Sequence, residues 1–133
     1  MTATEHSTNQ LPHEFRRIRL ELAREPGHPE GSRRDGCELI APLDKTGQID
    51  AALWRTHRAN CRVRRFRSAQ GEEIGHLVHR PGGSWAFHYD VLGDGDDEIG
   101  YRFENEKFQP GEYVSLKEGE KEHTFRVVSV ERI

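Results

Sequence analysis

Apolar and polar residues alternate along several short stretches of this chain, a spacing typical of β-strands with one buried face. In the clearest stretch Ile18, Leu20 and Leu22 alternate with charged residues, and Pro26 ends the strand. The same pattern predicts further strands at Cys37–Leu43, Cys61–Arg67, Ile99–Phe103, Glu112–Glu118 and Thr124–Val130, and a hairpin at Ile74–Val91.

Two stretches depart from simple alternation. In Cys61–Arg67 the apolar residues Val63 and Phe66 are three apart, so we expect a β-bulge near Arg64 to turn both inward. After a turn, Asp50 is a good helix N-cap for a short helix, about 51–60. Ile49 and Trp54 occupy the positions of a hydrophobic staple, and we expect Trp54 to pack the helix onto the sheet.

The hairpin allows two registers around Pro81–Gly83. With a two-residue loop His76 faces Tyr89 and Val78 faces Phe87, and nearly every large apolar residue lies on one side. With a three-residue loop His76 faces His88, and Ile74 faces Asp90, which splits the apolar residues between both faces. We expect the first register, with Trp85, Phe87 and Tyr89 sharing the inward side.

These elements predict an α+β, mostly β fold. About eight short antiparallel strands would form a curled sheet or small open barrel, with one short helix over an opening or face. Residues 1–12 are polar and non-periodic and are expected to be a disordered tail, while residues 13–133 form a single β-rich domain.

Composition sets limits on the function. Hydrophobic residues make up 33% and charged residues 32% of the chain, the net charge is −3, and the basic residues concentrate in the N-terminal half. We find no signal peptide and no apolar run long enough to span a membrane, so a cytoplasmic location is expected. Cys37 and Cys61 match no disulfide or metal spacing and are expected to be small buried residues.

An arginine cluster is the strongest compositional signal. It comprises Arg55, Arg58, Arg62, Arg64, Arg65 and Arg67, with Phe66 interleaved. Arginines beside an aromatic ring on a small barrel can hold phosphates and stack bases, so a nucleic acid or another anionic partner is one interpretation. The alternative is a solvated strand whose arginines pair with the exposed acidic loop Gly93–Asp97.

Histidines in the hairpin give a second hypothesis. His76, His79 and His88, with Asp90 nearby, could bind a metal ion in a metal-dependent enzyme. Their spacing matches no closed metal motif. Calcium-loop, dinucleotide and nucleophile-elbow patterns are each incomplete, so no cofactor is expected.

Two resemblances to known families accompany these patterns. The string Phe108–Leu116 resembles one in the flavin-binding barrel of ferredoxin-reductase-like flavoproteins, but the Arg-x-Tyr-Ser/Thr motif that follows in that family is missing from Thr124–Ser129. Through the segments LELAREPGHPEGS, GGSWAFHYD and PGEYVS, most of the chain resembles a family of small uncharacterised bacterial proteins. That second resemblance implies no activity.

The leading expectation is therefore a non-enzymatic binding module, either monomer or homodimer, whose partner is a nucleic acid or an acidic protein. The hairpin metal enzyme is the alternative. A third possibility is a subunit whose aromatic side chains, such as Trp85 and Tyr89, are covered by an oligomer partner.

Overall fold

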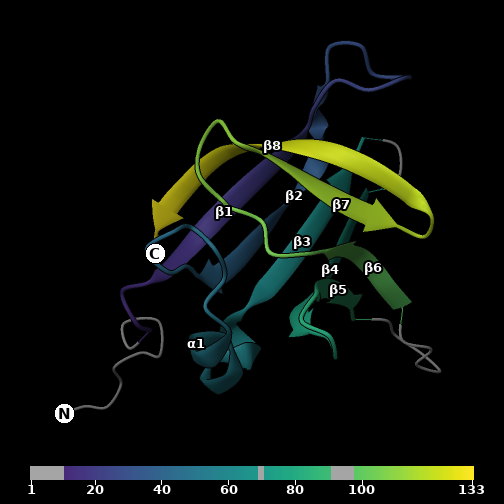
Figure 1. Ribbon diagram of the computed structural model, residues 1–133. Helices are drawn as coiled ribbons and strands as arrows, with labels where there is room; N and C mark the ends of the chain where they lie inside the picture. The colour runs from purple at the N-terminus through teal and green to yellow at the C-terminus, as the bar shows by residue number, and fades with distance from the viewer. Residues whose placement is uncertain (1–10, 69–70, 91–97) are drawn as a thin grey trace.

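The chain folds into a closed barrel of eight antiparallel strands in which every strand pairs with its neighbours in sequence and β8 pairs with β1 (Figure 1). The computed structural model describes residues 11–68, 71–90 and 98–133. The strands are β1 (Phe15–Leu22), β2 (Ser32–Pro42), β3 (Arg62–Arg67), β4 (Gly71–His79), β5 (Trp85–Tyr89), β6 (Glu98–Phe103), β7 (Tyr113–Glu118) and β8 (Lys121–Arg132). The prediction of a mostly β, antiparallel small barrel is confirmed, and the barrel is closed.

Parts of three predictions lie outside the described residues. They are the first ten residues of the expected tail, the pairing of Ile74 with Val91, and the acidic loop Gly93–Asp97 as a partner of the arginines. No helix in the described ranges has the length and apolar character needed to cross a membrane.

Apolar side chains fill the barrel interior. An eight-stranded barrel is just wide enough for side chains to pack across it, and here Trp85, Phe87, Phe125 and Leu116 are almost completely buried. The burial of Trp85 and of Tyr89 inside the barrel also shows that the idea of an oligomer partner covering them is wrong.

The hairpin of β4 and β5 adopts the register that we did not expect. His76 pairs with His88, Leu77 with Phe87, and the loop contains three residues. Trp85, Phe87 and Tyr89 do point inward as expected, but Leu77 joins them and Ile74 is exposed. Gly75 permits this register, since a Cβ at this position would collide with the carbonyl of His88 in the paired strand.

The bulge predicted in β3 is also wrong. β3 pairs with β2 and with β4 without a register shift, so its side chains alternate strictly. Val63 and Arg65 point inward, and Phe66 lies on the outer surface beneath the guanidinium groups of Arg19 and Arg64, 4.6 and 5.3 Å from its ring. Phe66 is thus buried by arginine side chains on the outer face.

One end of the barrel is closed by the short helix α1 (Ala51–Thr56), which is followed by a 3-10 turn, η2 (Arg58–Asn60) (Figure 1). Asp50 caps α1 as predicted, by accepting a hydrogen bond from the Leu53 amide, but the α-helix ends four residues earlier than expected. Trp54 packs edge-on against Trp85 and donates a hydrogen bond to the Leu77 carbonyl at 2.9 Å. We refer to this as the helix end of the barrel.

Candidate functional site

The predicted arginine cluster is divided among different sides of the molecule. Arg62 and Arg64 point outward from β3, whereas Arg65 points into the barrel and is 3% exposed. Arg55 lies on α1 and Arg58 on η2, both exposed. Because strict alternation places neighbouring residues of a strand on opposite faces, the six arginines do not form one continuous surface.

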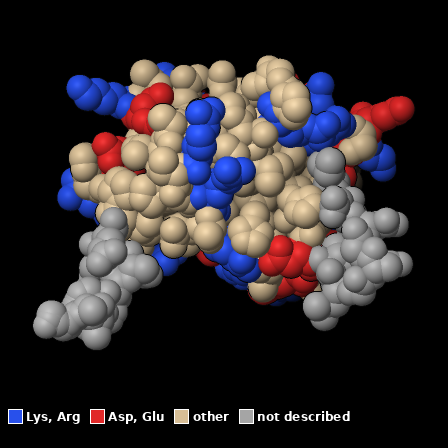
Figure 2. Space-filling model, turned by 90° about the horizontal axis from the view of Figure 1, so that it is seen from below, with Lys and Arg blue, Asp and Glu red and all other residues tan. Residues whose placement is uncertain are grey.

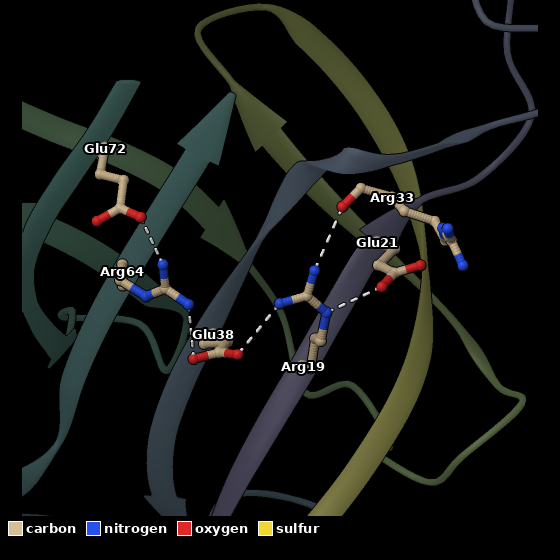
Figure 3. Close-up of polar contacts among 6 residues, drawn as sticks. All are labelled: Arg19, Glu21, Arg33, Glu38, Arg64 and Glu72. Atoms are coloured by element: carbon tan, nitrogen blue, oxygen red, sulfur yellow. Dashed lines mark hydrogen bonds and ion pairs between the residues drawn. The ribbon is translucent and has the colours of Figure 1, made fainter. Parts of the chain in front are cut away.

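The outer face of β1–β4 carries a charge-balanced row, which we define as Arg19, Glu38, Arg64 and Glu72 (Figure 3). Arg64 binds Glu38 at 2.9 Å and Glu72 at 2.6 Å, and Arg19 binds Glu38 at 3.2 Å. Burial alone would raise the pKa of the Glu38 carboxyl, but hydrogen bonds from Arg64 and Arg19 outweigh it and the pKa is lowered. These arginines are therefore occupied by carboxylates of the chain itself.

A second row on the same face, closer to the helix end, is basic. It comprises Arg17, Arg62, His76 and His88, which we call the basic row. Arg62 pairs in register with His76, and His76 with His88. Arg17 is exposed and has no ion pair with any residue in the described ranges, although Glu131 is opposite it on β8.

Asp90 is the one carboxylate that an ion pair joins to the basic row in the described part of the chain. It lies 3.3 Å from Arg62 Nη2 and 3.2 Å from His76 Nδ1. Arg62 Nη1 lies 2.8 Å from His76 Nε2. Since arginine can only donate, His76 is the acceptor of the Arg62 hydrogen bond at Nε2, and its other ring nitrogen, Nδ1, faces Asp90.

This geometry separates the predicted metal ligands. His76 and His88 do lie opposite each other, but both ring nitrogens of His76 face Arg62 and Asp90. His79 points to the other side of β4 and stacks on Trp85, with ring centroids 4.0 Å apart. In the part of the chain that the structure describes, no three His, Cys, Asp or Glu side chains form a group able to hold a metal ion.

Two shallow grooves with largely apolar surfaces flank the basic row. One, of about 180 Å³, lies between Ile40 and Ile74. It is bordered by Arg17 and Arg62 of the basic row and by Glu38 and Arg64 of the charge-balanced row. Ile74 is 47% exposed, which is unusual for an isoleucine in the middle of a strand. The other groove, of about 370 Å³, is lined by Arg58, Ala59, His76, Leu77, Val78 and His88.

Exposed basic side chains also lie on the helix end of the barrel, next to the basic row. Seen from that end, Lys and Arg side chains lie across the middle of the surface, and Asp and Glu side chains lie toward its edges (Figure 2). Arg55 and Arg58 are exposed there, and neither has an ion pair within the described ranges. Arg58 lies over the Trp54 ring at 5.3 Å.

The opposite end of the barrel, which we call the mouth, is closed by an ion pair instead of a helix. Inside it, Arg65 of β3 forms two hydrogen bonds with Glu118 of β7, at 2.7 and 2.8 Å. Tyr89 and Tyr101 contact the same guanidinium, Tyr89 through its hydroxyl at 3.3 Å and Tyr101 through its ring at 4.4 Å. Arg67 lies 3.6 Å from Glu118.

Sequence reasoning missed the role of Arg65. The signal was present, because uninterrupted alternation from Val63 would have placed Arg65 and Arg67 on the inner side and Phe66 on the outer side. The expected bulge would instead turn both apolar residues inward. The partner of Arg65 is 53 positions away in β7, and no local pattern indicates it.

Comparison with known proteins gave no match to a family model, to a curated protein sequence or to a solved structure. The function is therefore argued from the geometry alone.

Proposed function

We propose that this chain is a binding protein, and that the basic row with its two grooves docks an acidic protein segment that also carries aliphatic side chains. The observation that supports this proposal most is the contrast between two neighbouring rows on one face. The charge-balanced row is neutralised by carboxylates of the chain, whereas the basic row has one ion-paired carboxylate in the described ranges, Asp90. Arg17, which has no ion pair in the described ranges, and Arg62, which shares Asp90 with His76, carry more positive charge than this one carboxylate balances, and such an excess favours an anionic partner.

The grooves favour a protein partner over a nucleic acid. Single-stranded nucleic acids are bound through aromatic rings on which bases stack. Phe66 is covered by Arg19 and Arg64, and the exposed side chains between the cations are aliphatic, chiefly Ile74. Aliphatic side chains of a partner would bury this surface, and its carboxylates would meet Arg17 and Arg62.

A fluorescence anisotropy titration tests this proposal. The probe is a short labelled peptide that alternates Glu and Leu, compared with one that alternates Glu and Ser and with an oligothymidylate of equal charge. We expect the Glu–Leu peptide to bind most tightly and its affinity to fall with added salt. Arg62→Glu is expected to weaken it at least about tenfold, because reversing the charge replaces attraction by repulsion.

Arg34→Glu is the matched control, since Arg34 is also exposed on a strand but lies at the mouth end of β2, away from the basic row. Equal losses in the two variants would mean that only net charge matters, and would contradict the proposed site. Tightest binding of the oligothymidylate would instead establish a nucleic-acid partner.

A further inference from the structure

The mouth contains a buried cation that its neighbours satisfy incompletely. Arg65 uses both terminal nitrogens on Glu118, but its Nε is buried and has no hydrogen-bond partner among the residues that the structure describes. A buried donor with no acceptor is costly, so native structures retain few of them and each calls for an explanation. An additional acceptor supplied from outside the chain would provide one.

The arrangement also leaves a route to Arg65. Its side chain is 4% exposed, but that of Glu118 is 37% exposed, so Glu118 can turn toward solvent while Arg65 stays in place. Glu118 belongs to β7 and Arg65 to β3, which are not neighbours in the barrel, so their contact crosses the lumen. Glu118 thus occupies the position that a carboxylate entering from solvent would take on Arg65.

The cavity beside this pair is small and carries both charges. Its volume is about 160 Å³. This is more space than a few water molecules need, but less than the pockets that bind drug-sized ligands provide. Tyr101 and Phe125 contribute aromatic surface. The charged side chains that line it are Arg65, Arg67, Glu25, Asp35 and Glu118, with His123 paired to Glu25 at 3.2 Å.

This mixture of charges restricts the ligand. A simple anion would approach Arg65 past three carboxylates, and a simple cation would approach those carboxylates past two guanidinium groups. A molecule with a carboxylate and an ammonium group a few bonds apart satisfies both sets at once.

We propose that the mouth binds a small zwitterion of amino-acid type. Its carboxylate displaces Glu118 and binds Arg65 side-on, through Nε and one terminal nitrogen, and its ammonium group is held by the carboxylates of Glu25 and Asp35. No covalent step is involved. The site lies at the opposite end of the barrel from η2, so it is independent of the docking face proposed above.

NMR of the arginine Nε–Hε groups tests this proposal on the whole chain. The Arg65 signal is assigned by its loss in Arg65→Lys. Three probes of matched shape are then titrated: L-leucine, isocaproate, which lacks the amino group, and isoamylamine, which lacks the carboxylate. We expect leucine to shift the Arg65 signal at a concentration at least about tenfold lower than either half-molecule, because only leucine satisfies both charges.

Equal responses to all three probes, or no response of the Arg65 signal to leucine, would overturn the proposal. A second measurement addresses the role of Glu118. Glu118→Gln removes the carboxylate that forms both hydrogen bonds with the Arg65 terminal nitrogens, while Glu73 remains 3.6 Å from Arg65 Nη1, and the change is expected to raise the affinity for leucine and for isocaproate several-fold. The control Glu72→Gln, which removes a carboxylate from the outer face, should leave both affinities unchanged. Unchanged or weaker binding in Glu118→Gln would contradict displacement.

Discussion

The two ends of this barrel are closed by different kinds of contact. At the helix end, Trp54 packs on Trp85 and places its indole N–H on the Leu77 carbonyl, so the closure is apolar with one satisfied hydrogen bond. At the mouth, closure depends on the Arg65–Glu118 ion pair. Burial of apolar surface lowers the free energy of the folded state directly. In a buried ion pair, the cost of removing both charges from water cancels much of their electrostatic attraction.

The difference indicates which end can open. Separating Trp54 from Trp85 would expose a large apolar surface to water, which is costly. Turning Glu118 outward exposes mainly a carboxylate, which water solvates well, and it leaves the strands paired. We therefore expect the mouth to open to solvent more readily than the helix end.

The largest expected effect is the loss of the apolar closure. Trp54→Ala should lower the free energy of unfolding by about 3–5 kcal/mol, because it removes a large buried ring and leaves a cavity above Trp85. Chemical denaturation followed by far-UV circular dichroism measures this change. Arg55→Ala on the same helix is the control, and should change the value by less than about 0.5 kcal/mol since Arg55 is exposed.

A smaller effect is expected at the mouth. Glu118→Ala leaves the Arg65 charge without its main partner and should cost about 1–3 kcal/mol, less than for a fully buried pair because the Glu118 side chain is partly solvated. Arg65→Met removes the charge and retains the apolar stem, so it should cost less than Glu118→Ala. Denaturation of both variants provides the comparison, and the reverse order would show that the ion pair itself stabilises the barrel.

Sequence patterns predicted the elements of this fold better than their pairing. The alternation of Ile18, Leu20 and Leu22, and the cap at Asp50, depend on residues close together in the chain, and both are confirmed. The sequence allowed two hairpin registers, which differ in the apolar residues of the hairpin that face the barrel interior. The register adopted places Gly75 against the backbone of the paired strand, a close contact that composition does not reveal.

The candidate sites show the same limit. The arginines were visible in the sequence, but their division into a charge-balanced row, a basic row and a buried mouth residue depends on partners in other strands. Glu38 and Glu118, which neutralise Arg64 and Arg65, come from β2 and β7. A cluster of one residue type therefore indicates where charge is concentrated along the chain, and the fold determines which of those charges remain available.

Acid should weaken the mouth over a defined pH range. Burial acts to raise the pKa of the Glu118 carboxyl, but hydrogen bonding to Arg65 outweighs it and the pKa is lowered. The stability from this pair is thus fully present above the unfolded value, about pH 4.3, and is lost as pH falls through the lower folded value. The difference in unfolding free energy between wild type and Glu118→Gln should shrink over that range.

Glu106 provides an internal control of opposite sign. Burial raises the pKa of its carboxyl, so its ionisation opposes folding above about pH 4.3. Glu106→Gln should therefore become more favourable relative to wild type as pH rises through that region, while Glu118→Gln becomes less favourable. The same pH dependence in both variants would show that overall charge, not the Arg65 contact, sets the acid response.

The finest test compares how often each end opens. Cys37, opposite Arg65 in the β2–β3 pairing, and Cys61, at the end of η2, are both fully buried, and burial raises the pKa of each thiol to about 12. Neither should react with a disulfide reagent at pH 8 except during transient opening. We expect the single-thiol variant Cys61→Ser, which retains Cys37, to react a few-fold faster than Cys37→Ser, because the mouth is closed by an exchangeable ion pair. Glu118→Gln should widen this difference by speeding reaction at Cys37 alone, whereas equal acceleration of both thiols would mean that the barrel opens as one unit.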